Sequence, residues 1–155
     1  MVDINVGRLA RWLRLMGYDA RLFDGPDDNR MIRAALDEGR VLLTRDTQIL
    51  KRWVVTSGRL QVIFILSEDP RDQLRQVISS LGLDPKFHPF SRCLECNHPL
   101  EARDRDQVRC LVPPYVLETQ SGFTQCPACH RVYWRGTHWE SMSRELEEFA
   151  HVPGA

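Results

Sequence analysis

The sequence predicts an α/β fold with a parallel sheet, followed by a small zinc-binding module. In the first half of the chain, short apolar runs alternate with segments of helical periodicity. Strands that alternate with helices form parallel sheets with helices on both faces. All five cysteines lie after residue 92, which marks a second module of different composition. We therefore expect a Rossmann-like, three-layer domain over residues 1–88 and a zinc ribbon over residues 91–155, joined by a proline-containing linker at 84–92.

The expected strands are short and apolar. Residues 41–44 and 62–66 are typical of buried strands, and residues 18–23 are a less apolar candidate. A very short leading segment, Met1-Val2, precedes Asp3.

Three segments between these strands have helical periodicity. In residues 8–16, apolar side chains recur at i, i+3, i+4 and i+7. Residues 28–38 form the second segment, with Gly39 placed to end the helix. Residues 69–81 form the third, with Pro70 at the first helical position.

Charge and hydropathy exclude two classes of protein. The chain has 21 Lys and Arg residues and 21 Asp and Glu residues, so it has no net positive charge with which to bind nucleic acid. A local basic face remains possible. The longest apolar run, residues 62–66, is far shorter than the roughly 18 residues that cross a bilayer. Charged residues near the start also interrupt any signal-peptide pattern. We expect a cytoplasmic protein without membrane contact.

Acidic residues follow the expected strands where parallel α/β folds place their active sites. Asp3 follows the leading segment, Asp46 follows residues 41–44, and Asp28 opens the second helix at the same edge. Carboxylate oxygens are the ligands that Mg²⁺ and Mn²⁺ prefer, and such an ion activates water and neutralises a phosphate. The three residues are therefore predicted to be catalytic metal ligands for phosphodiester chemistry. Taken alone, Asp28 could be a helix N-cap, and Asp3 and Asp46 could be turn residues. The position of all three at one edge of the sheet favours the metal-ligand interpretation.

Two Cys-x-x-Cys pairs, Cys93 with Cys96 and Cys126 with Cys129, have the spacing of a tetrahedral zinc site. The alternative is a disulfide framework, which a cytoplasmic chain disfavours. We expect structural zinc, without an open coordination position, on which folding of the small module depends. The remaining Cys110 is predicted to be a small core residue.

Three stretches carry a family resemblance. They are residues 3–19, DINVGRLARWLRLMGYD; residues 43–46, LTRD; and the two cysteine pairs together with residues 132–139, VYWRGTHW. In this order they resemble the signatures of the PIN-like ribonuclease domains found at the C-terminus of the Mut-seven exonuclease and in free-standing prokaryotic proteins. The resemblance implies a PIN fold, a zinc ribbon and metal-dependent cleavage of RNA, with Asp3, Asp28 and Asp46 as the acids.

The chain departs from that family at the acid site. Many PIN domains have a fourth acid after the third, whereas Thr47 and Gln48 follow Asp46 here. Asn5 is the nearest polar substitute, so we expect one catalytic ion rather than two.

Substrate contacts are expected from arginines within the signatures: Arg11, Arg14 and Arg45. Arginines opposite an apolar stripe are alternatively a solvated face. The ribbon's Tyr133 and Trp134 could stack on RNA, but we favour packing against the first domain.

The resulting hypothesis is an Mg²⁺- or Mn²⁺-dependent endoribonuclease with structural Zn²⁺, whose partner is RNA and which dimerises if it follows many PIN domains. One alternative is a non-catalytic RNA- or ribosome-binding adaptor that uses the ribbon. Another is an aspartyl-phosphatase-like phosphohydrolase, because Asp3-Ile4-Asn5-Val6 is similar to an Asp-x-Asp-x-Thr nucleophile loop. Asn5 stands where that loop needs its second acid.

Overall fold

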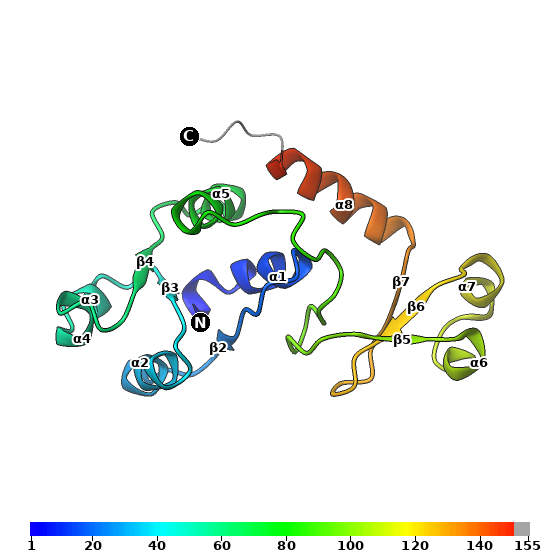
Figure 1. Ribbon diagram of the computed structural model, residues 1–155, viewed down its shortest axis with the longest axis horizontal. Helices are drawn as coiled ribbons and strands as arrows, with labels where there is room; N and C mark the ends of the chain where they lie inside the picture. The colour runs from blue at the N-terminus through cyan, green and yellow to red at the C-terminus, as the bar shows by residue number, and fades with distance from the viewer. Residues whose placement is uncertain (151–155) are drawn as a thin grey trace. The chain divides into compact units, whose positions relative to one another are not determined.

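The computed structural model describes residues 1–150, which divide into two compact units (Figure 1). Unit 1 contains residues 1–13 and 19–83, and unit 2 contains residues 14–18 and everything described from residue 84 on. Helix α1 (Arg8–Leu15) therefore begins in unit 1 and ends in unit 2. Within residues 1–150, none of the helices is long and apolar enough to cross a bilayer.

Unit 1 is built on a four-stranded parallel sheet, which confirms the predicted α/β class. Its strands are β1 (Val2–Asp3), β2 (Leu22–Phe23), β3 (Leu42–Thr44) and β4 (Val62–Phe64), in the order β2-β1-β3-β4. All three residues of β3 are buried, as the apolar run predicts for a central strand.

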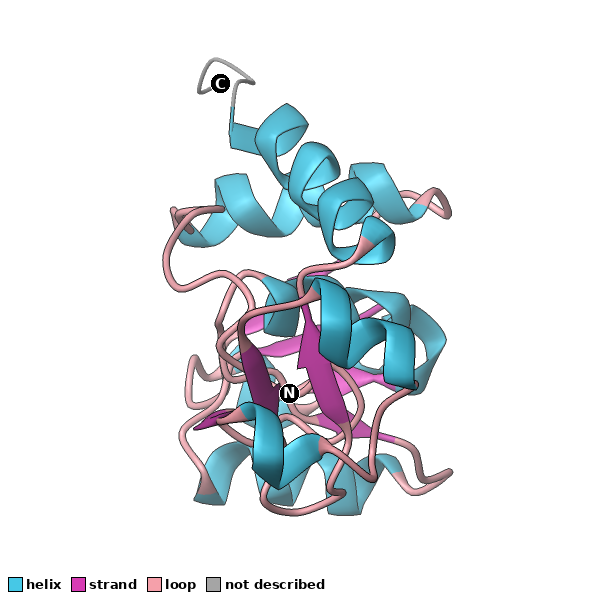
Figure 2. Ribbon diagram, turned by 90° about the vertical axis from the view of Figure 1, so that its right-hand side faces the viewer, coloured by secondary structure: helices cyan, strands magenta, loops and turns pink. Residues whose placement is uncertain are grey.

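The helices of unit 1 include the three expected from periodicity. They are α1, α2 (Asp28–Asp37) and α5 (Pro70–Leu81), to which the structure adds a 3-10 turn η1 (Ile4–Val6) and two four-residue helices, α3 (Thr47–Leu50) and α4 (Trp53–Thr56). Asp69 caps α5, with its side chain accepting from two backbone N–H groups. The helices α3 and α4 are too short to show a periodic pattern. Figure 2 shows how small a share of the chain the strands occupy beside the helices.

Part of the core of unit 1 lies where β3 meets α2 and α3. One buried cluster contains seven apolar residues: Met1, Met31, Ile32, Ala35, Leu42, Ile49 and Leu60. Val54 and Val55 of α4 pack against this cluster. The short helices α3 and α4 are therefore fixed by apolar contacts as well as by their own hydrogen bonds.

Unit 2 is a small antiparallel sheet with three helices. The strands are β5 (Glu101–Arg103), β6 (Phe123–Gln125) and β7 (Val132–Trp134), and the helices are α6 (Arg105–Val108), α7 (Pro114–Thr119) and α8 (Thr137–Ala150). Its buried cluster is small: Val108, Val112, Val116 and Phe123. Trp134 is partly buried and packs against this cluster, so part of its side chain belongs to the core of unit 2.

The segment 84–92, expected as a linker, is anchored within unit 2. The backbone N–H groups of His88 and Phe90 donate to the carbonyls of Met16 and Leu15, at 3.1 and 2.9 Å. Gly17 lies beside them with φ +95°, and a Cβ at this position would overlap the carbonyl oxygen of His88. The turn after α1 and this segment therefore form one closely packed element.

Cys110 corrects one prediction, because it is exposed rather than part of the core. It lies midway between Val108 and Val112, which are both buried in the core of unit 2. Cys110 thus occupies the outward position of the turn that follows α6.

Candidate functional site

Asp3 is a buried acid at the carboxyl end of β1, with only 7% of its surface exposed. Its Oδ2 accepts hydrogen bonds from Thr44 Oγ1 at 2.6 Å and from Asn5 Nδ2 at 2.8 Å. Both donors are neutral, and within the described chain Asp3 forms no ion pair. Buried charges in proteins are paired or coordinate metals, so this carboxylate fits a cation ligand.

Thr44 connects Asp3 to Asp46. While its hydroxyl donates to Asp3, the same oxygen accepts the backbone N–H of Asp46 at 3.0 Å. Asp46 is half-buried and is the N-cap of α3, where its Oδ1 accepts from Gln48 N at 2.8 Å. One buried hydroxyl thus links the carboxylate of Asp3, at the end of β1, to the backbone of Asp46, which follows β3.

Asn5 belongs to the same network. Its Nδ2 donates to Asp3, and its Oδ1 accepts the backbone N–H of Arg45 at 3.2 Å. The amide therefore links the turn after β1 to the turn after β3, at the place where the sequence analysis expects a substitute for a fourth acid.

Asp28 is the first residue of α2, after β2, and is half-buried. The helix N-cap is Asp27, whose Oδ1 accepts from Asn29 N and Arg30 N at 2.9 and 3.2 Å. The capping alternative for Asp28 is therefore wrong.

The strand order explains why these acids share one edge. In the order β2-β1-β3-β4, the chain passes from β1 to β2 on one side and then crosses to β3 on the other side of β1. Ligands of such sheets bind beyond the carboxyl ends of the strands at this switch point. Asp3 and Asp46 follow the two strands at the switch. Their carboxylates and that of Asp28 do not form a gathered ligand group, however. Over residues 1–150 only the four cysteines do so. The catalytic role of the three acids stays a prediction.

The three arginines expected to bind substrate have different surroundings. Arg14 is 6% exposed, and its Nη1 donates to the carbonyls of Leu94 and Glu95 at 2.8 and 2.9 Å, inside unit 2. The side opposite the apolar stripe of α1 is thus covered at the last turn, and neither a solvated face nor a phosphate contact fits Arg14. Arg11 is exposed. Arg45 makes a surface ion pair with Glu68 at 3.1 Å, which a phosphate can replace at little cost.

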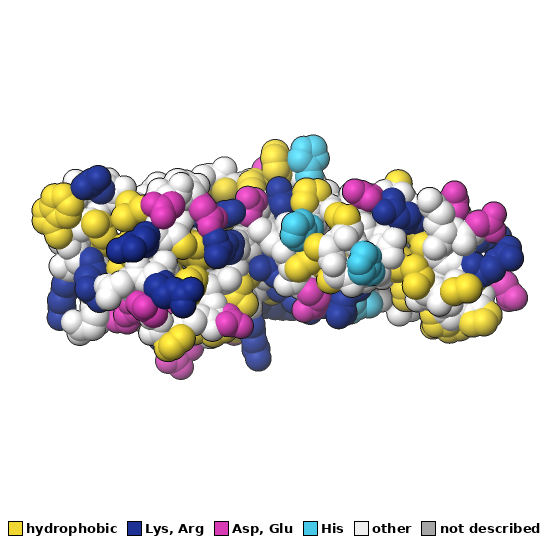
Figure 3. Space-filling view, turned by 90° about the horizontal axis from the view of Figure 1, so that it is seen from below, with side chains coloured by type: hydrophobic (Ala, Val, Ile, Leu, Met, Phe, Trp, Pro, Cys, Tyr) yellow, Lys and Arg dark blue, Asp and Glu magenta, His cyan; other side chains and the backbone are white. Residues whose placement is uncertain are grey.

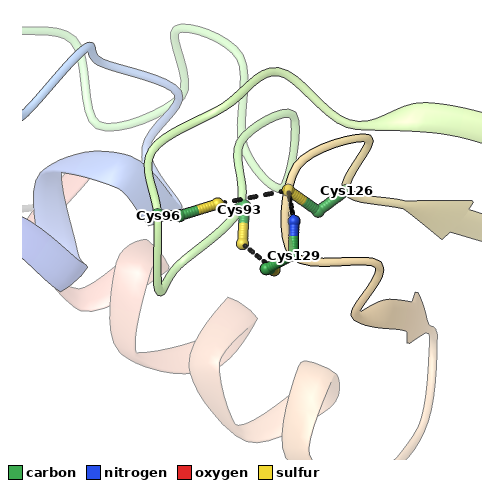
Figure 4. Close-up of side chains that lie close together, drawn as sticks. All are labelled: Cys93, Cys96, Cys126 and Cys129. Atoms are coloured by element: carbon green, nitrogen blue, oxygen red, sulfur yellow. Dashed lines mark hydrogen bonds between the residues drawn. The ribbon is translucent and has the colours of Figure 1, made fainter.

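The second site is a cluster of four thiols (Figure 4), formed by Cys93, Cys96, Cys126 and Cys129. All four Sγ atoms lie within 4.8 Å of one another, and the pairs Cys93–Cys129 and Cys96–Cys126 are 3.6 and 3.2 Å apart. Tetrahedral zinc with Zn–S bonds of about 2.3 Å separates its sulfurs by roughly 3.8 Å. The donor set and its spacing therefore fit zinc, with no coordination position left open.

Two turns of the same geometry present these thiols. Asn97 N donates to Cys93 O, and His130 N donates to Cys126 O, both at 3.0 Å. Asn97 and His130 have φ values of 70° and 62°, so each turn closes in the left-handed region. Two such knuckles facing each other form a closed four-thiolate site.

The surroundings of Cys93 and Cys96 shift the pKa values of their thiols in opposite directions. Burial raises the pKa of Cys93, but hydrogen bonds from Tyr133 and from backbone N–H groups outweigh it and lower the pKa to about 6. Burial and the neighbouring thiol of Cys126 raise the pKa of Cys96 to about 12. Tyr133 Oη lies 3.2 Å from Cys93 Sγ and accepts the backbone N–H of Leu94 at 3.1 Å. Tyr133 therefore supports the first knuckle through its hydroxyl group.

The fold and the two sites define an α/β protein with acids at the switch point of a parallel sheet and a four-cysteine, zinc-ribbon-like module. The chain belongs to the Mut7-C RNAse domain family, whose model matches residues 1–146. Membership in this family suggests a ribonuclease. No curated protein and no solved structure matches the chain significantly.

Two residues that matter for these sites were missed from sequence. Thr44 ends an apolar run that predicts a strand, and a hydroxyl at the carboxyl end of a buried strand needs a hydrogen-bond partner at that edge. The sequence around Tyr133 indicates only an aromatic ring suited to packing or stacking. Its hydroxyl had no signal in the sequence, because the sheet alone brings β7 to the first knuckle.

Proposed function

We propose that the chain is a metal-dependent ribonuclease that hydrolyses RNA phosphodiester bonds internally. The observation that carries the proposal is the buried Asp3 carboxylate, which has neutral hydrogen-bond donors and, in residues 1–150, no ionic partner. The family suggests the reaction class, and this carboxylate supports a cation as the missing partner.

Each residue of the network has a defined task. Asp3, Asp46 and Asp28 would hold Mg²⁺ or Mn²⁺, which supplies an activated water and neutralises charge on the phosphate. Thr44 and Asn5 keep the Asp3 carboxylate oriented by donating to Oδ2. Arg45 and Arg11 are suited to bind the phosphates on either side of the cut. The zinc ribbon has a structural role in this proposal.

The test is a cleavage assay on total RNA with added Mn²⁺, comparing the wild type with Asp46→Asn. Asn is as good an N-cap as Asp, so α3 should stay folded while the metal loses a charged ligand. We expect cleavage to fall by at least a hundredfold. The matched control is Asp37→Asn, which changes an exposed acid at the end of α2 and should cut like the wild type. Full activity of Asp46→Asn would refute the site, and RNA binding without any cleavage by the wild type would favour the adaptor.

A further inference from the structure

An exposed tryptophan stands on the surface of unit 1 beyond Asp46. Trp53 opens α4 and is 66% exposed, whereas its neighbours Val54 and Val55 pack against the core. The core contacts of α4 therefore hold the indole outward. Most of the surface of this ring is therefore open to a ligand.

Positive charge surrounds this ring. The guanidinium of Arg59 lies over the indole, 5.4 Å from its centre, and Lys51 and Arg52 are exposed directly before Trp53. We call these four residues, Lys51, Arg52, Trp53 and Arg59, the Trp53 patch. Figure 3 shows hydrophobic side chains beside Lys and Arg side chains over this part of unit 1, at the left.

The charge of the patch is not neutralised locally. No Asp or Glu occurs between Thr47 and Ser67. As far as the structure describes the chain, Lys51, Arg52 and Arg59 make no ion pair. In contrast, Arg75 and Arg109 each pair with an aspartate three residues earlier. The patch is a local basic face in a chain whose net charge is zero.

We infer that the Trp53 patch binds single-stranded RNA, with a base stacked on Trp53 and phosphates on the neighbouring cations. An aromatic platform with cations beside it is the combination that single strands use. The patch also lies close to the candidate catalytic edge. Asp46 caps α3, whose four residues span about 6 Å, and Trp53 follows three residues after the last of them. The inference rests on the proposed function, because the bound RNA would run from the acid site across α3 to Trp53.

The test is binding of a fluorescent single-stranded RNA oligonucleotide to the full, zinc-loaded chain without added Mg²⁺ or Mn²⁺. We expect Trp53→Ala to weaken binding about tenfold, because stacking on an aromatic ring contributes that order of affinity, and Trp53→Phe to retain most of it. Lys51→Ala and Arg52→Ala should each lower the slope of log affinity against log salt by about 0.7, the value for one phosphate contact on a single strand.

Matched controls come from the same chain. Tyr115 is also 66% exposed, but lies in unit 2, so Tyr115→Ala should bind like the wild type. Arg33→Ala removes an exposed cation of α2 and should leave the salt slope unchanged. Circular dichroism of Trp53→Ala should match that of the wild type, which would show that the variant is folded. The salt slopes of Lys51→Ala and Arg52→Ala test the patch independently of Trp53.

Two results would overturn the inference: wild-type affinity in Trp53→Ala with unchanged salt slopes, or a change from dimer to monomer in Trp53→Ala while RNA affinity stays the same. The second result would assign the patch to an interface between copies. Failure of the proposed function is distinguishable, because RNA binding that depends on Trp53 in a chain that cuts no RNA supports the patch and refutes the nuclease. If cleavage depends on Asp46 but RNA binding does not depend on Trp53, the nuclease is supported and the RNA-binding patch is refuted.

Discussion

The two units are stabilised in different ways. Unit 1 buries seven apolar residues in the cluster around β3, whereas the cluster of unit 2 has four, next to four cysteines. Small modules with a limited core commonly depend on a metal or a disulfide for folding. Hydrophobic burial therefore holds the parallel sheet, whereas we expect the ribbon to depend on a metal held by its four thiols.

The acid site and the thiol site differ in how closely their ligand atoms are gathered. The four Sγ atoms are already gathered, because two equivalent knuckles place them, whereas the acids share an edge without converging. A structural metal site is closed by its fold, and a site for a substrate-bound ion keeps positions open. The difference between the sites therefore matches the difference between their proposed roles.

Removal of zinc should produce the largest difference in stability between the two units. Cys126→Ser, or a zinc chelator, is expected to unfold unit 2 while unit 1 keeps its protected amides, since structural zinc contributes on the order of 10 kcal/mol to folding. Hydrogen exchange resolved by residue measures both units at once. Cys110→Ser is the control, because this exposed thiol lies outside the cluster and its loss should change nothing. Simultaneous loss of protection in both units would show that they do not differ as argued.

Acid should act on the same site. The raised pKa of Cys96, about 12, means that its thiol carries a proton at neutral pH which zinc must displace. Zinc affinity should therefore fall as pH falls, by up to about tenfold per pH unit for each displaced proton.

A third prediction compares two glycines with positive φ. At Gly17, φ is +95° and a Cβ would overlap the His88 carbonyl, whereas at Gly39, φ is +61° and nothing lies within 4 Å. Gly17→Ala should cost about 3 kcal/mol, from strain and overlap together, and Gly39→Ala only about 1 kcal/mol. Urea unfolding of both variants measures the difference. Equal costs would mean that the segment around His88 moves freely and is not anchored.

Elements with a periodic or repeated pattern were predictable from sequence. The strands 42–44 and 62–64, the capped helix 70–81 and the Cys-x-x-Cys pairs each carry their own local signal, and the structure has all of them. Such signals depend on neighbours in the chain, which a sequence shows directly.

Contacts between distant segments were not predictable. Arg14 looked like part of a solvated or phosphate-binding row, because nothing in residues 8–16 indicates that a knuckle 80 residues later covers the last turn. Cys110 looked like a core residue because its type is usually buried, yet its position between two buried valines turns it outward. Residue type and periodicity leave such tertiary partners undetermined.

A smaller effect than that of Gly17→Ala is expected at Arg14, which ties the last turn of α1 to the first knuckle. Arg14→Met keeps the length of the side chain but leaves the carbonyls of Leu94 and Glu95 without this donor, at a cost of about 2 kcal/mol. The loss falls on the ribbon, so zinc should transfer to a colorimetric chelator faster, while amide protection in β3 stays as it is. Arg8→Met, at an exposed position of the same helix, should transfer zinc at the wild-type rate. If Arg14→Met also did so, the guanidinium would not support the knuckle, and the stability of unit 2 would have to come from the thiols and the small core alone.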